Sequence, residues 1–129
     1  MPDFDQIQFN THAFSELNRF LETDKIPNAL LFYGEENTRK KEAGIYFAKA
    51  ANCLERTVPP CGRCRACSKI DTGHHPDIHT IVPIQGKKNI VIAQIREMTA
   101  TISSKPNEGR TRTVMIQSAD QMNVQAQNA

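Results

Sequence analysis

The chain has 129 residues, with 16 lysines and arginines, 14 aspartates and glutamates, and a formal net charge of +2. This length suits one domain with a single core, and so small a net charge does not by itself indicate nucleic-acid binding. No apolar stretch approaches the ~20 residues of a membrane span, and the acidic start lacks the apolar core of a signal peptide. We therefore expect a cytoplasmic protein with no membrane partner, in which clustered cysteines indicate a metal site rather than disulfides.

The first half of the chain is predicted to form a helix, a strand and a second helix. Apolar residues at helical spacing predict a helix over residues 13–22. The continuous apolar run Ala29–Tyr33 ends at Gly34 and is typical of a buried parallel strand. After a polar loop, a second apolar stripe predicts a helix from about Ala43 to Ala51.

The second half alternates strands and helices. Residues 78–82 alternate as a strand does, residues 92–102 have helical apolar spacing, and residues 113–116 form another strand candidate. Residues 120–129 have the pattern of a helix that starts and does not end, so we expect a truncated domain whose C-terminal part is missing. Strands alternating with helices predict an α/β fold with a mostly parallel sheet.

Four cysteines cluster in the middle of the chain with the spacing C-x7-C-x2-C-x2-C. They are Cys53, Cys61, Cys64 and Cys67. The C-x2-C spacing lets one turn of chain direct its sulfurs to one point, and Zn²⁺ in structural sites takes four such ligands in a tetrahedron. The sequence therefore predicts one structural zinc ion.

Other interpretations of these cysteines are four unmodified thiols, two disulfides, or a redox C-x-x-C pair, and a histidine at His74 or His75 could replace one ligand. The spacing favours four thiolate ligands over each of these. Such a closed site has no open position for water, so we expect no catalysis there.

The segment from Gly34 to Lys41 stands where a phosphate loop would stand, after a predicted strand and before a helix. Gly34 and Lys40 match the working pattern G-x-x-x-x-G-K-[ST]. Arg39 replaces the second glycine and brings a side chain where backbone N–H groups approach phosphate, and Lys41 replaces the hydroxyl that ligates Mg²⁺. We expect a degenerate site that does not use ATP.

The second half of a nucleotide site, a pair of acidic residues directly after a strand, is also missing. The strand at residues 113–116 is followed by Gln117, Ser118 and Ala119, and the only nearby acid is Asp120. Asp120 is predicted to cap the next helix. Both parts of the site that would bind Mg²⁺, the phosphate loop and the segment after the strand, therefore differ from those of an active ATPase.

Several motifs occur in an order that resembles a known family. They are Ala29–Gly34, the cysteine cluster, His75–Asp77, Ile95–Glu97 and Ala119–Met122. From about Phe9 to Ala129 the chain resembles the N-terminal ATPase-type module of bacterial DNA polymerase III clamp-loader subunits. The cysteine segment followed by His-Pro-Asp is the most specific part of this resemblance.

The resemblance implies a P-loop NTPase-like AAA+ fold over residues 1–129, with a zinc-binding insertion at about 53–77. The family contains active ATPase subunits, gamma and tau, and a silent relative, delta prime, which the degenerate phosphate loop favours. The implied function is a non-catalytic, stator-like subunit that helps a ring containing gamma or tau and delta to load the sliding clamp on primed DNA.

Two alternatives stay open. The chain could be an active ATPase of the same ring, which the substitutions at Arg39 and Lys41 disfavour. It could instead be a zinc module that binds nucleic acid through Arg63, Arg65 and Lys69, although no aromatic residue is interleaved with these cations.

Overall fold

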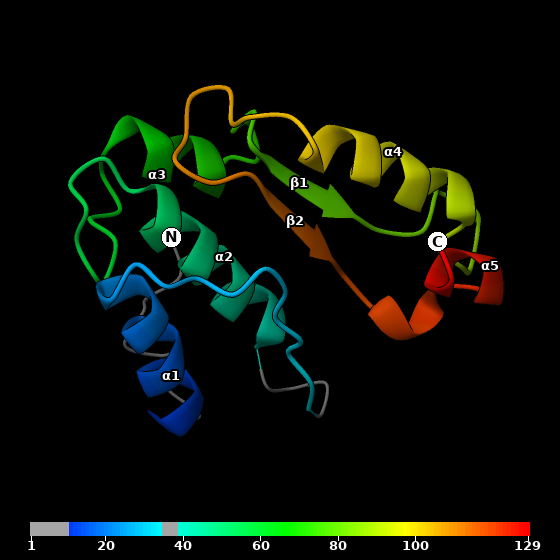
Figure 1. Ribbon diagram of the computed structural model, residues 1–129, viewed down its shortest axis with the longest axis horizontal. Coiled ribbons are helices and arrows are strands. Elements are labelled where there is room, and N and C mark those ends of the chain that lie inside the picture. Colours follow the sequence, from blue (N-terminus) through cyan, green and yellow to red (C-terminus); the bar gives the residue numbers. More distant parts are fainter. Residues whose placement is uncertain (1–10, 35–38) are drawn as a thin grey trace. The chain divides into compact units, whose positions relative to one another are not determined.

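The computed structural model describes residues 11–34 and 39–129, which belong to two compact units that meet between His75 and Pro76 in the sequence. The first unit contains the helices α1 (Thr11–Glu22), α2 (Lys40–Asn52) and α3 (Arg65–Asp71) (Figure 1). The second unit contains the elements β1 (Ile78–Ile81), α4 (Ile92–Ile102), β2 (Thr113–Ile116), the 3-10 helix η3 (Ala119–Gln121) and α5 (Val124–Gln127).

Helix α2 forms the centre of the first unit, because every residue from Tyr46 to Asn52 is buried. Helix α1 packs on it through an edge-to-face contact between the rings of Phe14 and Tyr46, 5.3 Å apart, and through a 2.8 Å hydrogen bond from Tyr46 to Asn18. The predictions of these two helices are confirmed.

The predicted buried strand at Ala29–Tyr33 is wrong. The run forms no strand, and Leu31 and Tyr33 keep 76% and 87% of their surface exposed. A strand needs a neighbour that accepts and donates its backbone hydrogen bonds. Across residues 11–34 and 39–129 the two named strands, at residues 78–81 and 113–116, pair with each other and not with this run. The apolar residues of the run do not by themselves supply a strand to pair with.

The second unit is a βαβ arrangement in which β1 and β2 pair in parallel, with Ile78 opposite Thr113 and Ile81 opposite Ile116. Both strands and the intervening helix α4 fall where the sequence predicted them. A small core forms around Ile90, Ile95 and Ala126. The parallel α/β character is therefore confirmed, at the scale of a two-stranded sheet in the described part of the chain.

The predicted helix over residues 120–129 is wrong in detail, because it is interrupted at Met122 and Asn123. Met122 pairs with Ile90 in an isolated parallel bridge, which takes the chain out of helical geometry. The Asn123 side chain then accepts a 2.9 Å hydrogen bond from the Ala126 N–H and caps α5. Asp120 lies inside η3 and is not the cap.

Within the two described ranges, no helix is long and apolar enough to cross a membrane.

Candidate metal centre

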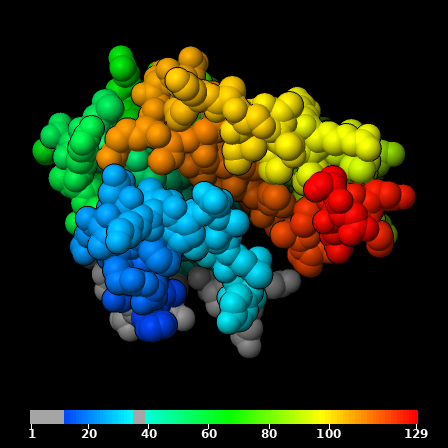
Figure 2. All heavy atoms as spheres, in the orientation of Figure 1, coloured from blue at the N-terminus to red at the C-terminus, as the bar shows by residue number. Residues whose placement is uncertain are grey.

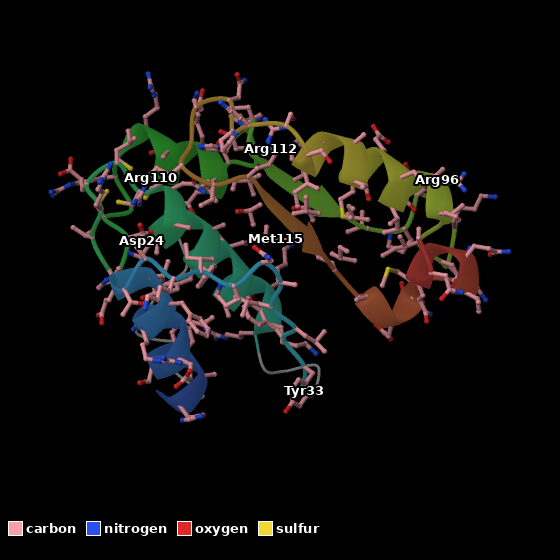
Figure 3. The ribbon with its side chains drawn as sticks, viewed as in Figure 1. Asp24, Tyr33, Arg96, Arg110, Arg112 and Met115 are labelled. Carbon is pink, nitrogen blue, oxygen red and sulfur yellow. The ribbon has the colours of Figure 1, made fainter. Side chains whose placement is uncertain are left out.

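The four cysteines come together at the adjoining ends of α2 and α3, around the loop that joins them. Cys53 directly follows the last residue of α2, and Cys64 and Cys67 lie at the start of α3. All four Sγ atoms, including that of Cys61 in the loop, lie within 4.8 Å of one another. Figure 3 shows the yellow sulfur atoms gathered beside this loop.

Backbone N–H groups point at three of the sulfur atoms. The N–H of Cys61 donates to Cys53 Sγ at 3.5 Å, that of Cys64 to Cys61 Sγ at 3.3 Å, and that of Cys67 to Cys64 Sγ at 3.4 Å. Such bonds stabilise thiolates, since the N–H dipoles offset their negative charge. The loop is therefore folded around the four sulfur atoms.

The geometry fits one tetrahedral metal ion. A Zn–S distance of 2.3 Å places tetrahedral sulfur ligands about 3.8 Å apart, and the observed spread needs only a small contraction to reach it. None of these four cysteines forms a disulfide. Cys53 and Cys67 are fully buried, whereas Cys61 and Cys64 are partly exposed.

The thiols differ in acidity. Burial opposes ionisation of Cys53, but hydrogen bonds from Cys61 and Thr57 outweigh it and lower the pKa of Cys53 to about 6. Burial likewise opposes ionisation of Cys64, whose pKa is nevertheless lowered by the N–H of Cys67. Burial raises the pKa of the Cys67 thiol well above its ordinary value. Metal binding would therefore displace at least one proton at neutral pH.

An ion pair joins α2 to α3 beside the cysteines, and the sequence analysis missed it. The Lys49 side chain has no exposed surface, and its Nζ lies 2.8 Å and 3.0 Å from the two carboxylate oxygens of Asp71. The available signal was a lysine within an otherwise apolar stretch of helix, between Ala48 and Ala50.

Asp77 is a second buried charge that the sequence analysis missed, although its His-Pro-Asp motif had been noted. It is fully buried and accepts hydrogen bonds from the backbone N–H groups of Asn107, Glu108 and Gly109. Arg112 donates to the same carboxylate at 3.3 Å. The pKa of Asp77 is about 2, because these hydrogen bonds outweigh the opposing effect of burial. Asp77 therefore fixes the loop between α4 and β2.

The two residues that match a phosphate loop contact each other. Lys40 is the first residue of α2, and its Nζ donates a 2.8 Å hydrogen bond to the Gly34 carbonyl. Arg39, which replaces the second glycine of the pattern, has a left-handed backbone with φ of 52°. Residues 35–38 of the predicted loop lie outside the described residues.

The cations named for nucleic-acid binding lie close in sequence to the four cysteines. Arg63 and Arg65 are exposed, and Lys69 is half-buried on α3. In the space-filling view of Figure 2, the green segment that contains them lies at the surface.

Residues 9–129 match the family model described as DNA polymerase III, delta subunit. The DNA polymerase III subunit delta' of Bacillus subtilis (strain 168) is 36% identical over 109 residues, which cover 84% of this chain and 32% of that protein. The Pseudomonas aeruginosa subunit delta' is 29% identical over 79% of this chain and 31% of its own length.

A more distant relative is the tau/gamma subunit of Haemophilus influenzae, which is 27% identical over 92% of this chain and 17% of its own length. The chain spans about a third of the length of the delta' relatives that it matches. Since the family model extends over nearly the whole sequence, the chain belongs to the DNA polymerase III delta' family of clamp-loader subunits.

Proposed function

We propose that this chain is the N-terminal, AAA+-type part of a non-catalytic clamp-loader subunit. The observation that supports this most is the match to delta' subunits in a chain whose phosphate loop has Arg39 and Lys41 at the positions of glycine and hydroxyl. The subunit would act as a rigid, stator-like cytoplasmic partner of gamma or tau and delta. It would reach the sliding clamp and primed DNA through the complex.

The test of this function has two parts. The complete gene product, carrying an affinity tag, should co-purify with gamma or tau and delta and restore clamp loading to a mixture that lacks it. The 129-residue chain incubated alone with Mg²⁺ and ATP should show no turnover, because the ligands for Mg²⁺ are missing. Failure to co-purify would contradict the clamp-loader role.

An active ATPase of the same ring is the second candidate, since tau/gamma subunits are also among the relatives. Turnover that requires Mg²⁺ and disappears in a Lys40→Ala variant would establish this candidate instead. The substitutions at Arg39 and Lys41 disfavour it, because a working loop has a glycine and a hydroxyl residue at these positions.

The four-cysteine cluster is proposed to hold one structural zinc ion. Its donor set, four sulfurs that a single ion can reach, is that of a closed structural site. The role would be to fasten the loop between α2 and α3, with no chemistry at the metal.

Metal analysis of the purified chain is expected to give about one zinc per molecule. A thiol reagent should then find few reactive cysteines until a chelator removes the metal, after which the partly exposed Cys61 and Cys64 should react. A native protein that lacks metal and shows both of these thiols reactive from the start would refute the zinc centre.

A further inference from the structure

We propose that Lys49 and Asp71 are a positioning pair, which holds the two buried metal ligands in register before the metal binds. The inference rests on the proposed metal role of Cys53 and Cys67. Lys49, Cys53 and Cys67 have no exposed surface, and the Asp71 side chain is 23% exposed. The pair is therefore shielded from solvent on the lysine side.

The sequence spacing places one ligand and one charge on the same face of each helix. Cys53 follows Lys49 by four residues at the end of α2, and Asp71 follows Cys67 by four residues in α3. Residues four apart on a helix are neighbours, with about 5–6 Å between their Cβ atoms. The ion pair and the ligand pair therefore join the same two helices at points about one turn apart.

This arrangement fixes how α3 lies along α2. Because Lys49 meets Asp71 and Cys53 meets Cys67, the two helices must run antiparallel. A slide of one turn, about 5.4 Å, would separate the charges as well as the sulfurs. Separating a buried ammonium from its carboxylate is strongly unfavourable, so the ion pair restricts α3 to the register in which both buried sulfurs face one point.

The outer ligands have no such support from helix packing. Cys61 lies in the loop and Cys64 at the N-cap of α3. The bonds that place them are N–H···S bonds at the loop and at the first turn of α3, with no side-chain ion pair between helices among them. If the ion pair already holds the buried Cys53 and Cys67 in place, the metal has to order only the loop that carries the other two cysteines. Loss of the ion pair should thus weaken metal binding, since the metal would then also have to set the helix register.

The experiment measures zinc affinity of the 129-residue chain by competition with a chromogenic chelator. Lys49→Met and Asp71→Asn are each expected to weaken binding on the order of 10- to 100-fold, as for other groups that orient metal ligands. Asp71→Glu, which keeps the carboxylate, should bind within a few-fold of the original protein. Lys41→Met makes the same charge change at an exposed position of α2 and should leave affinity unchanged.

Unchanged affinity in both Lys49→Met and Asp71→Asn would overturn the positioning role and leave the zinc centre intact. Absence of zinc binding by the unmodified chain would instead refute the metal centre itself. Circular dichroism of each variant shows whether its helices are formed.

A second measurement needs no variant. In the unmodified chain stripped of metal, amide hydrogens of residues 47–52 and 67–71 should stay protected from exchange, while residues 54–63 exchange quickly. Equally fast exchange in all three segments would show that the metal, and not the ion pair, sets the helix register, and would overturn the proposal even if the variants fail to fold.

Discussion

Replacing Asp77 with asparagine is expected to lower the free energy of unfolding by about 3–5 kcal/mol, the usual cost of breaking a buried charged pair. The carboxylate accepts hydrogen bonds from three consecutive N–H groups, two of them at 2.9 Å and 2.6 Å, and from Arg112. Asparagine has the same shape, but its NH₂ group would face N–H donors that need an acceptor. Urea denaturation measures the difference.

The matched control is Asp120→Asn, which removes the same charge from an exposed position in η3. Its effect should stay within about 0.5 kcal/mol, as for most surface substitutions. A small effect of Asp77→Asn, similar to this control, would mean that the loop between α4 and β2 does not depend on the buried carboxylate.

The difference in free energy of unfolding between the unmodified chain and Asp77→Asn is also predicted to depend on pH. The pKa of Asp77 is about 2 in the folded chain against an ordinary value of 3.8, so the unfolded chain takes up the proton first as pH falls. The stabilisation from this shift, roughly 2 kcal/mol, is present above about pH 4 and is lost as the pH approaches 2. The difference in free energy of unfolding between the unmodified chain and Asp77→Asn should therefore become smaller between about pH 4 and pH 2. A difference that stays constant over this interval would contradict the lowered pKa of Asp77.

The elements that sequence predicted well are those whose pattern and packing agree. Helix α4 begins and ends at the predicted residues, Ile92 and Ile102, because its apolar stripe faces the core formed with Ile90. The β-branched strand β2 was also located correctly. The cysteine spacing predicted that the four sulfurs would come together, and they lie within 4.8 Å of one another.

The Ala29–Tyr33 run shows where such patterns fail. A short apolar run has the same sequence pattern whether it is a buried strand or an exposed connection. The difference lies in whether another strand pairs with it, which depends on distant segments. Residues 120–129 failed for a related reason, because the bridge from Met122 to Ile90 joins positions 32 residues apart.

Asp77 and Lys49 could not have been assigned their roles from sequence alone. The partners of Asp77 are backbone N–H groups about 30 residues later, which exist at any residue type and leave no sequence signature. Lys49 was an anomaly in an apolar helix face, but its carboxylate partner, 22 residues away, could be chosen only from the packing of α2 on α3. Long-range polar contacts of this kind become visible only in three dimensions.

Replacing Cys64 is expected to separate its two roles, because its Sγ is both a proposed ligand and the acceptor that caps α3 through the Cys67 N–H. Cys64→Ser and Cys64→Ala should both weaken zinc binding by at least a hundredfold. That loss corresponds to about 3 kcal/mol, a quarter of the roughly 10–16 kcal/mol that a structural zinc site contributes.

With metal absent, the two variants should differ. Serine is a preferred N-cap and alanine is not, so Cys64→Ser should keep α3 more stable by about 1 kcal/mol, seen as slower hydrogen exchange in residues 67–71. Equal exchange in both variants would contradict the capping role, and retained zinc in either would remove Cys64 from the ligand set. Strands β1 and β2 should exchange alike in both, since they belong to the other compact unit. Damage from a lost ligand would then be confined to the unit that contains the metal centre, and residues 76–129 should keep their sheet without zinc.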